Sequence, residues 1–165
     1  MPRLEPGSTI IPAHGSIRFA LFGGADIDKH IRVDEMYGFD LSAFSNLVPG
    51  KHYLNRNDLS LELLSEPQDA FSFDFAGSDT FPRHDRQSLP VMASTSGRCA
   101  GIIQWIRLEM DDSVVFENHP SHNNPASGWQ HCLFILPQPI HVTPGRVLNI
   151  TALHNRNTPW FFFEA

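Results

Sequence analysis

The chain has 165 residues, of which 41% are hydrophobic, and its 12 lysines and arginines against 18 aspartates and glutamates give a formal net charge of −6. A chain of this length is expected to fold as one domain, residues 1–165. The acidic balance argues against nucleic-acid binding. No apolar run approaches the roughly 20 residues that span a bilayer, and no signal-peptide pattern is present, so we expect a cytoplasmic protein with no membrane partner.

Alternation of apolar and polar residues with a period of two dominates the chain and predicts β-strands. The predicted strands cover residues 16–21, 70–75, 101–110, 132–136, 147–153 and 160–163. Residues 40–44 and 57–64 could each hold a short helix, although the leucines of the second segment also alternate as in a strand. We therefore predict an all-β domain, a single antiparallel β-barrel or barrel-like sandwich with one or two short helices. Its core is expected to extend from about residue 11 to 163.

Turn residues separate the predicted strands. The Pro-Gly pair at 144–145 lies between two strand segments and predicts a hairpin, and the pair at 49–50 predicts another turn. The polar segments 77–87 and 118–128 are expected to be surface loops. Turns of this kind fit a chain of consecutive strands.

Histidines and cysteines offer only a weak case for a metal site. His119 and His122 stand three residues apart and His131 follows nearby, but no third ligand has a recognised zinc spacing. We expect loop histidines, and a metal-dependent enzyme that uses these three residues stays an alternative. Cys99 and Cys132 form no Cys-x-x-Cys motif and are expected to be buried thiols.

The sequence contains no complete motif for nucleophilic or nucleotide chemistry. Gly23 and Gly24 follow a predicted strand, but a third glycine and a convincing helix are missing, so we expect a hairpin or bulge turn here. Residues 94–97 form a small-residue turn and not the Gly-x-Ser-x-Gly elbow of a serine hydrolase. The residue pattern alone therefore predicts a β domain without its own catalytic group.

Five segments carry a recognisable order of residues. They are residues 11–21, the Tyr-Gly-Phe-Asp segment 37–40, residues 64–75, residues 101–106, and residues 127–134 with their Ser-Gly-Trp start. In this order they resemble the β-barrel domain of the protein arginine methyltransferases. In that family a Rossmann-type domain binds S-adenosylmethionine, and the barrel follows it and helps to hold the protein substrate. The resemblance covers about residues 11 to 163.

The chain departs from the family pattern in several places. The glycine motif for the methyl donor and the paired-glutamate loop belong to the family's other domain and do not occur here. In the family's threonine-histidine-tryptophan loop, Ser127 stands at the threonine position, Gly128 replaces the histidine, and Trp129 is retained. The segment 40–64 is shorter than the family's helical dimerisation arm, and residues 119–125 lengthen the signature loop.

The resemblance implies an accessory, substrate-presenting barrel of an arginine N-methyltransferase-like protein, which is not catalytic alone. Its expected partners are a Rossmann-type methyltransferase domain or chain and a protein substrate with an arginine. The chain itself would hold no cofactor, because S-adenosylmethionine would be bound by the partner. Trp129, with Ser127 and Gly128, would face that partner, although packing against the core is an equally good reading of Trp129. Glu117 and Asp112 would attract the arginine, or else are solvated loop charges.

A binding module is the alternative from a different class. A β-sandwich could grip a sugar or peptide through aromatic residues such as Trp105 and Trp160. Such a site needs a coplanar row of exposed rings. We expect both tryptophans to be mostly buried, which disfavours this alternative.

Overall fold

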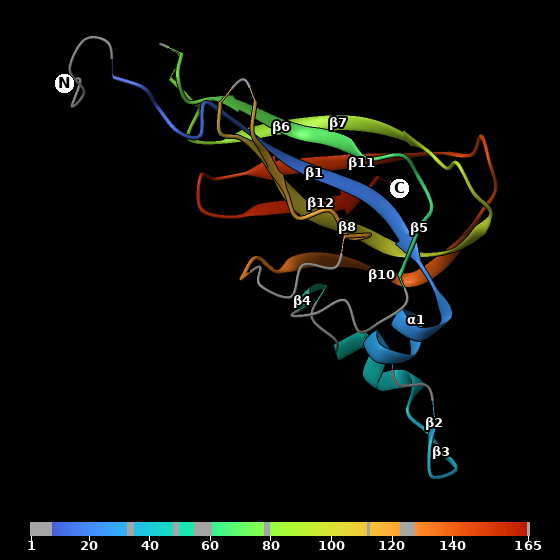
Figure 1. Ribbon diagram of the computed structural model, residues 1–165. Helices are drawn as coiled ribbons and strands as arrows, with labels where there is room; N and C mark the ends of the chain where they lie inside the picture. Colours follow the sequence, from blue (N-terminus) through green and yellow to red (C-terminus); the bar gives the residue numbers. More distant parts are fainter. Residues whose placement is uncertain are drawn as a thin grey trace.

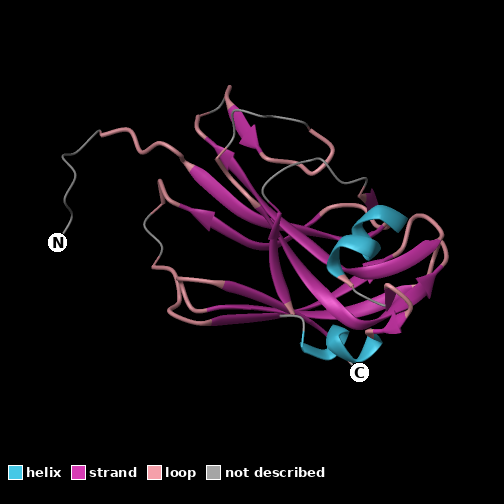
Figure 2. Ribbon diagram, turned by 90° about the horizontal axis from the view of Figure 1, so that it is seen from below, coloured by secondary structure: helices cyan, strands magenta, loops and turns pink. Residues whose placement is uncertain are grey.

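The computed structural model describes residues 8–32, 35–47, 50–54, 61–77, 80–111, 113–122 and 128–164. These residues contain twelve β-strands, one α-helix, α1 (Ala25–Ile31), and one 3-10 helix, η1 (Ser42–Leu47) (Figure 1 and Figure 2). All strand pairs are antiparallel. The predicted all-β class is confirmed. Neither described helix is long and apolar enough to cross a membrane.

The larger sheet has seven strands. They are β1 (His14–Gly23), β4 (Lys51–Leu54), β5 (Glu62–Leu63), β6 (Gln68–Asp74), β8 (Gly97–Glu109), β9 (Val115–Glu117) and β10 (His131–Val142). The path runs β4–β10–β8–β1–β5, with β6 paired to β1 and β9 paired to β8. β1 is central, because it pairs with β8 along its whole length and with β5 and β6 on its other side.

A smaller sheet packs against the first and has the order β12–β11–β7. Its strands are β7 (Asp85–Met92), β11 (Val147–His154) and β12 (Pro159–Phe163). The predicted turn at Pro144 and Gly145 is present, with the Arg146 amide donating to the Thr143 carbonyl at 3.0 Å. The strands that it connects, β10 and β11, lie in different sheets. The hairpin prediction is therefore wrong, and the turn instead carries the chain from one sheet to the other.

The main core lies between the two sheets. Period-two alternation turns Phe19 and Leu21 of β1 inward, where they meet inward residues of both sheets. The fully buried members include Phe19, Leu21, Val91, Cys99, Ile102, Val142, Ile150 and Ala152. Cys99 and Cys132 are buried free thiols, as predicted, and burial raises the pKa of each to about 11.

α1 covers part of the outer face of the larger sheet and forms a second core. Ile27 and Ile31 are buried against outward residues of β1, β8 and β10. Of the two expectations for Gly23 and Gly24, the bulge agrees with a register shift between Phe22 and Gly23 opposite β8. The hairpin is wrong, because Gly24 leads from β1 into α1. Gly24 has a φ of 125°, and a Cβ on Gly23 would overlap the Arg98 carbonyl of β8.

The end of α1 is tied to an irregular part of β10. Opposite β8, the register of β10 jumps from Ile135 to Ile140, and the stretch between them contains two prolines, which have no N–H for the ladder. The guanidinium of Arg32, just after α1, donates to the carbonyls of Leu136 and Pro137. A side chain therefore satisfies carbonyls in a stretch of β10 where the ladder to β8 is interrupted.

Sequence patterns missed several short elements. β4, β7 and the hairpin of β2 (Glu35–Met36) and β3 (Phe39–Asp40) were not predicted. The expected loop 77–87 is too long, because Asp85 already begins β7. η1 begins within the predicted segment 40–44. The turn at residue 49 and the first half of the segment 57–64 lie outside the described residues, and β5 lies in the described half of that segment.

Lys51 joins the two sheets where β4 and β10 meet β12. Its Nζ lies 4.9 Å from the ring centroid of Trp160 and 5.4 Å from those of Tyr53 and Phe134. The same ammonium donates a hydrogen bond of 3.4 Å to the Pro159 carbonyl. Cation–π contacts and one hydrogen bond thus link the two sheets through a side chain.

Candidate functional site on the seven-stranded sheet

The outer face of the larger sheet changes from apolar to charged along β1 and β8. Near α1, Ala20 of β1 lies beside Ile103 of β8 in the apolar half. The following pairs on this face are Arg18 with Trp105, Ser16 with Arg107, and His14 with Glu109. Because side chains of one face recur every second residue, the charged half is a continuous strip. We call this strip, together with Glu117 of β9 and Asp69 of β6, the charged face.

Glu117 is the centre of the charged face. Its Oε1 accepts hydrogen bonds from Trp105 Nε1 at 2.7 Å and from Arg18 Nη1 at 3.0 Å. Arg107 Nε lies 3.9 Å from Glu117 Oε2, and Arg18 Nε lies 2.9 Å from an oxygen of Asp69. The Glu117 side chain is only 19% exposed and the indole of Trp105 is fully buried. Glu117 therefore satisfies a buried indole N–H and holds two guanidinium groups in place.

The residues after β9 fold over Trp105. The Asn118 side-chain oxygen accepts the Ile106 amide at 3.0 Å, and His131 Nε2 donates to the Asn118 carbonyl at 2.7 Å. The His119 ring lies edge-on to Trp105, with ring centroids 5.2 Å apart. Burial lowers the pKa of both histidines from its usual value, so their neutral forms are favoured.

The three candidate metal ligands do not form a metal site. His119 and His122 lie with ring centroids 5.2 Å apart, but the Nε2 of His131 is already used in the bond to the Asn118 carbonyl. Across the described residues, no group of three or more His, Cys, Asp or Glu side chains could hold a metal ion. The geometry gives a metal-dependent enzyme no support.

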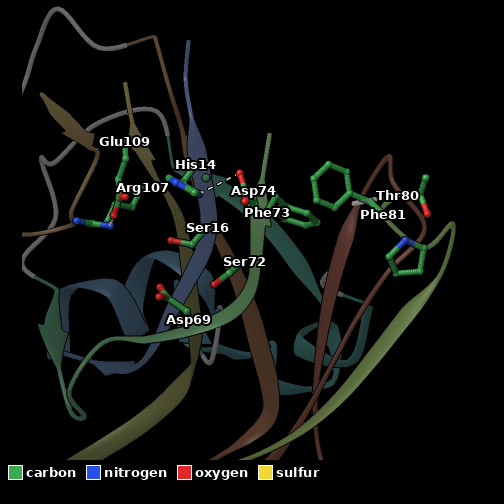
Figure 3. Close-up of a pocket in the computed structure, with 12 residues that line it drawn as sticks. His14, Ser16, Asp69, Ser72, Phe73, Asp74, Thr80, Phe81, Arg107 and Glu109 are labelled. Carbon is green, nitrogen blue, oxygen red and sulfur yellow. Dashed lines mark hydrogen bonds and ion pairs between the residues drawn. The ribbon is translucent and has the colours of Figure 1, made fainter. Parts of the chain in front are cut away.

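A pocket of about 520 Å³ opens at the end of the charged face (Figure 3). Three carboxylates, Asp69, Asp74 and Glu109, line it together with Arg107 and His14. Glu109 bonds Arg107, and His14 Nδ1 lies 3.5 Å from Asp74. Asp69 and Asp74 are 45% and 47% exposed, so both carboxylates reach solvent. The carboxylates outnumber the guanidinium groups in the lining, which favours a cationic ligand.

The residues singled out for a partner contact have different positions in the structure. Trp129 is 58% exposed and Gly128 is exposed as well, with open space where a Cβ would be. Glu117 lies in the charged face, mostly buried. Ser127 and Asp112 lie outside the described residues. The alternative in which Trp129 packs into the core does not fit its exposure.

The two tryptophans of the sugar-binding alternative behave differently. Trp105 is fully buried, as expected, but Trp160 is 39% exposed, so the expectation of burial is wrong for that residue. The Trp160 ring is nearly parallel to the exposed ring of Phe162, with centroids 6.5 Å apart. However, the Lys51 ammonium already lies over the Trp160 ring. The pair therefore offers a sugar only part of the flat surface that stacking needs.

The β2–β3 hairpin is a second candidate surface. It projects beyond α1 and η1, away from the two sheets (Figure 1). Tyr37 and Gly38 have φ values of 54° and 81°, as a two-residue type I′ turn requires. Tyr37 is 93% exposed, and Met36, Phe39 and Phe44 are also exposed. Exposed apolar side chains on a projecting hairpin are typical of a surface that meets another chain.

Sequence reasoning missed most of the partners that build the charged face. Arg18 and Asp69 were not singled out, although the alternation places Arg18 between two inward apolar residues and so on the outer face. Asp74 lies in the predicted strand 70–75 and was not singled out either. The signal that could have found them is a charged residue at an outward position in each of several neighbouring strands.

Comparison with known proteins identifies a family by sequence and a similar fold among solved structures. The sequence matches the family model of the arginine methyltransferase oligomerization subdomain over residues 16–161. Among solved structures, the chain is similar to a chain of the Trypanosoma brucei PRMT1 enzyme-prozyme heterotetrameric complex with AdoHcy, with a TM-score of 0.67 and 12% sequence identity. The match covers 93% of this chain and 52% of that chain, so this chain spans about half the length of the solved relative. No curated protein sequence matches.

Proposed function

The chain belongs to the arginine methyltransferase oligomerization subdomain family, and from this premise we propose that it is an accessory barrel. It presents a protein substrate to a Rossmann-type methyltransferase domain or chain and is not catalytic alone. The observation that carries the proposal is the exposure of Trp129, at 58%, in the loop that follows the charged face. A large aromatic side chain in that position is suited to contact with a partner.

The base of the Trp129 loop is held by hydrogen bonds, which suits a contact surface. Asn118 bonds the Ile106 amide on one side and His131 on the other, and Glu117 anchors the strand before the loop. A partner that docks on Trp129 therefore meets a loop whose two ends are already held. Less conformational entropy of the loop is then lost when the partner binds.

We propose that S-adenosylmethionine is held by the partner. Its binding in the family depends on a glycine-rich turn between a parallel strand and a helix, and the described residues do not fit that requirement. The β1–α1 connection is the nearest equivalent, but β1 belongs to an antiparallel sheet and Gly23 is packed against the Arg98 carbonyl. Methyl transfer requires the donor methyl close to the acceptor nitrogen and in line with it, and the partner would supply that geometry.

We propose that the pocket of the charged face helps to hold the cationic substrate. Asp69 and Asp74 are the better candidates for attraction, because both are about half exposed and line the pocket. Glu117 is less suited to this role, since its side chain is only 19% exposed and its Oε1 accepts bonds from both Arg18 and Trp105. By contrast, Asp69 pairs with Arg18 alone among the described residues and is 45% exposed. In this proposal Glu117 positions the surface and the two aspartates attract the arginine.

We also propose that the β2–β3 hairpin contacts a partner chain. Its exposed Met36, Tyr37 and Phe39 lie on a short arm that extends from the barrel. The solved relative comes from a heterotetrameric complex, and assembly with other chains is the role for which the family model is named. The hairpin is the part of the described structure that is best placed for such a contact.

The proposal is tested by mixing the chain with each Rossmann-type arginine methyltransferase chain of the same organism. Binding is measured by calorimetry, and methylation is measured on a Gly-Arg-rich peptide with S-adenosylmethionine. We expect no methylation by this chain alone, and binding to a partner that Trp129→Ala weakens at least tenfold. Phe162→Ala is the matched control, because it removes another exposed aromatic ring from the other sheet. Methylation by the chain alone, or equal binding by the two variants, would contradict the proposal.

A further inference from the structure

A second cavity, of about 590 Å³, lies at the end of the barrel where β1 and β6 meet the turn between β11 and β12. It shares Phe73, Thr80 and Phe81 with the lining of the charged pocket (Figure 3). Its volume is within the range of small-molecule sites, about 300–1,000 Å³. We call it the mouth cavity.

The walls of the mouth cavity are mainly aromatic. The Phe73 ring lies 5.3 Å from that of Phe81 and 6.1 Å from that of Phe75, and the Phe75 and Phe81 rings are 5.8 Å apart. Ile17 of β1 contributes an aliphatic wall. Such a surface stabilises the hydrocarbon part of a ligand by removing it from water.

Two nitrogen-bearing side chains line the same cavity. His154 is 5% exposed, and its Nδ1 accepts a hydrogen bond of 3.2 Å from the Arg156 amide. The proton of the neutral ring is therefore on Nε2. His154 lies in the lining of the cavity beside Arg156, and its ring can donate one hydrogen bond through this nitrogen.

Arg156 is held in place at the rim. Its guanidinium donates to the Pro82 carbonyl at 3.2 Å through Nε and to the Phe81 carbonyl through Nη2. Its φ of 68° lies in the left-handed region, which a non-glycine residue adopts only when its surroundings hold it there. Arg156 makes no ion pair with a carboxylate in the described parts of the chain.

The charges of the two pockets are opposite in kind. Asp69, Asp74 and Glu109 line the charged pocket, whereas the lining of the mouth cavity contains Arg156 and His154 and no carboxylate among the described residues. In a chain with a formal charge of −6, a cavity of this composition favours an anionic group beside an apolar body.

We propose that the mouth cavity binds a small apolar carboxylate, with its hydrocarbon part among Phe73, Phe75 and Phe81 and its carboxylate at Arg156 and His154. Neither Trp129 nor the partner contact takes part in this binding. The site is therefore independent of the accessory function proposed above.

Decanoate and decan-1-ol are the probes, because they share a hydrocarbon chain and differ in the charged end. Each is titrated into the full chain, and binding is followed by calorimetry and by two-dimensional amide NMR. We expect saturable decanoate binding, at least tenfold tighter than that of decan-1-ol, with shifts at residues 80–81 and 154–158 and none at Trp129. No saturable binding, shifts elsewhere, or equal affinity for the two probes would overturn the proposal.

Two variants and a control localise the interaction. Arg156→Gln should weaken decanoate about tenfold, the effect expected from loss of one charged hydrogen bond, and should leave decan-1-ol unchanged. Thr158→Trp should fill the cavity and remove the binding of both probes. Arg98→Gln, which deletes an exposed guanidinium near α1, should leave the affinities for decanoate and for decan-1-ol unchanged. Decanoate binding that Arg156→Gln leaves unchanged would overturn the role of the guanidinium, and the NMR map of the unaltered chain tests the site even if a variant fails to fold.

Discussion

Replacing Glu117 by alanine tests whether this residue holds the charged face together. The change removes the acceptor of the Trp105 indole N–H, at 2.7 Å, while Arg18 keeps its contact with Asp69 at 2.9 Å. An unsatisfied buried donor costs about 1–3 kcal/mol. We expect Glu117→Ala to lower the free energy of unfolding by about 2.5 kcal/mol, which corresponds to a fall in Tm of about 5–10 °C for a domain of this size.

Glu117→Gln is the informative control, because glutamine keeps a carbonyl oxygen for Trp105 and loses only the negative charge. We expect this variant to lower the free energy of unfolding by about 1 kcal/mol. The measurement is urea unfolding followed by far-UV circular dichroism, and a double-mutant cycle with Trp105→Phe should give a coupling energy of about 1.5 kcal/mol. Equal effects of the alanine and glutamine variants, or a coupling energy near zero, would refute the reasoning from the indole bond.

Three other predictions concern thiols, pH and packing. Cys99 and Cys132, whose pKa values burial raises to about 11, should react with Ellman's reagent at pH 8 only after unfolding; rapid labelling of the native chain would contradict this. Because burial lowers the pKa of His131 in the folded state, its contribution to stability should be complete above about pH 6.5 and decline as pH falls below that value. The free energy of unfolding, measured with urea at pH 7.5 and at pH 5, should differ less between the two pH values for His131→Gln than for the unaltered chain. Gly101→Ala should lower the free energy of unfolding by about 3 kcal/mol, since its Cβ would overlap a carbonyl of β10, whereas Gly128→Ala, with open space around it, should change it by less than about 0.5 kcal/mol.

The strands that could be predicted are those in which one face is buried and the other polar. β6, β11 and the halves of β1 and β8 away from α1 show this alternation, because their inward residues meet the main core and their outward residues are mostly polar. Near α1, both faces of β1 and β8 are buried. β7 could not be found in this way. It is an edge strand with Pro90 inside it and few apolar residues, and it exists because β11 pairs along its whole length.

α1 was missed for a related reason. It has seven residues, its N-cap residue is Gly24, which offers no side-chain hydrogen bond, and it is too short to be stable alone. Burial of Ile27 and Ile31 against the sheet stabilises it, and that contact is tertiary. The local sequence shows no extended helical periodicity that would predict such a helix.

The candidate site was only partly predictable. Trp129 was singled out through a resemblance of its loop, and Glu117 through its charge and position near that loop. The contact between Glu117 and Arg18 joins residues 99 positions apart, and it depends on the register of β1 and β9 against β8. Register of this kind follows from the folded sheet and cannot be read from spacing along the chain.

The three tryptophans lie in different environments, so their intrinsic fluorescence can report on different parts of the protein. Trp105 is sealed in the interior with its indole bonded to a carboxylate, Trp160 lies under an ammonium group, and Trp129 reaches solvent. Collisional quenching by acrylamide should therefore act on their emission in the order Trp129, Trp160, Trp105. A partner that shields the loop would remove the most easily quenched component and leave the most protected one unaltered, so docking could be followed without attaching any dye.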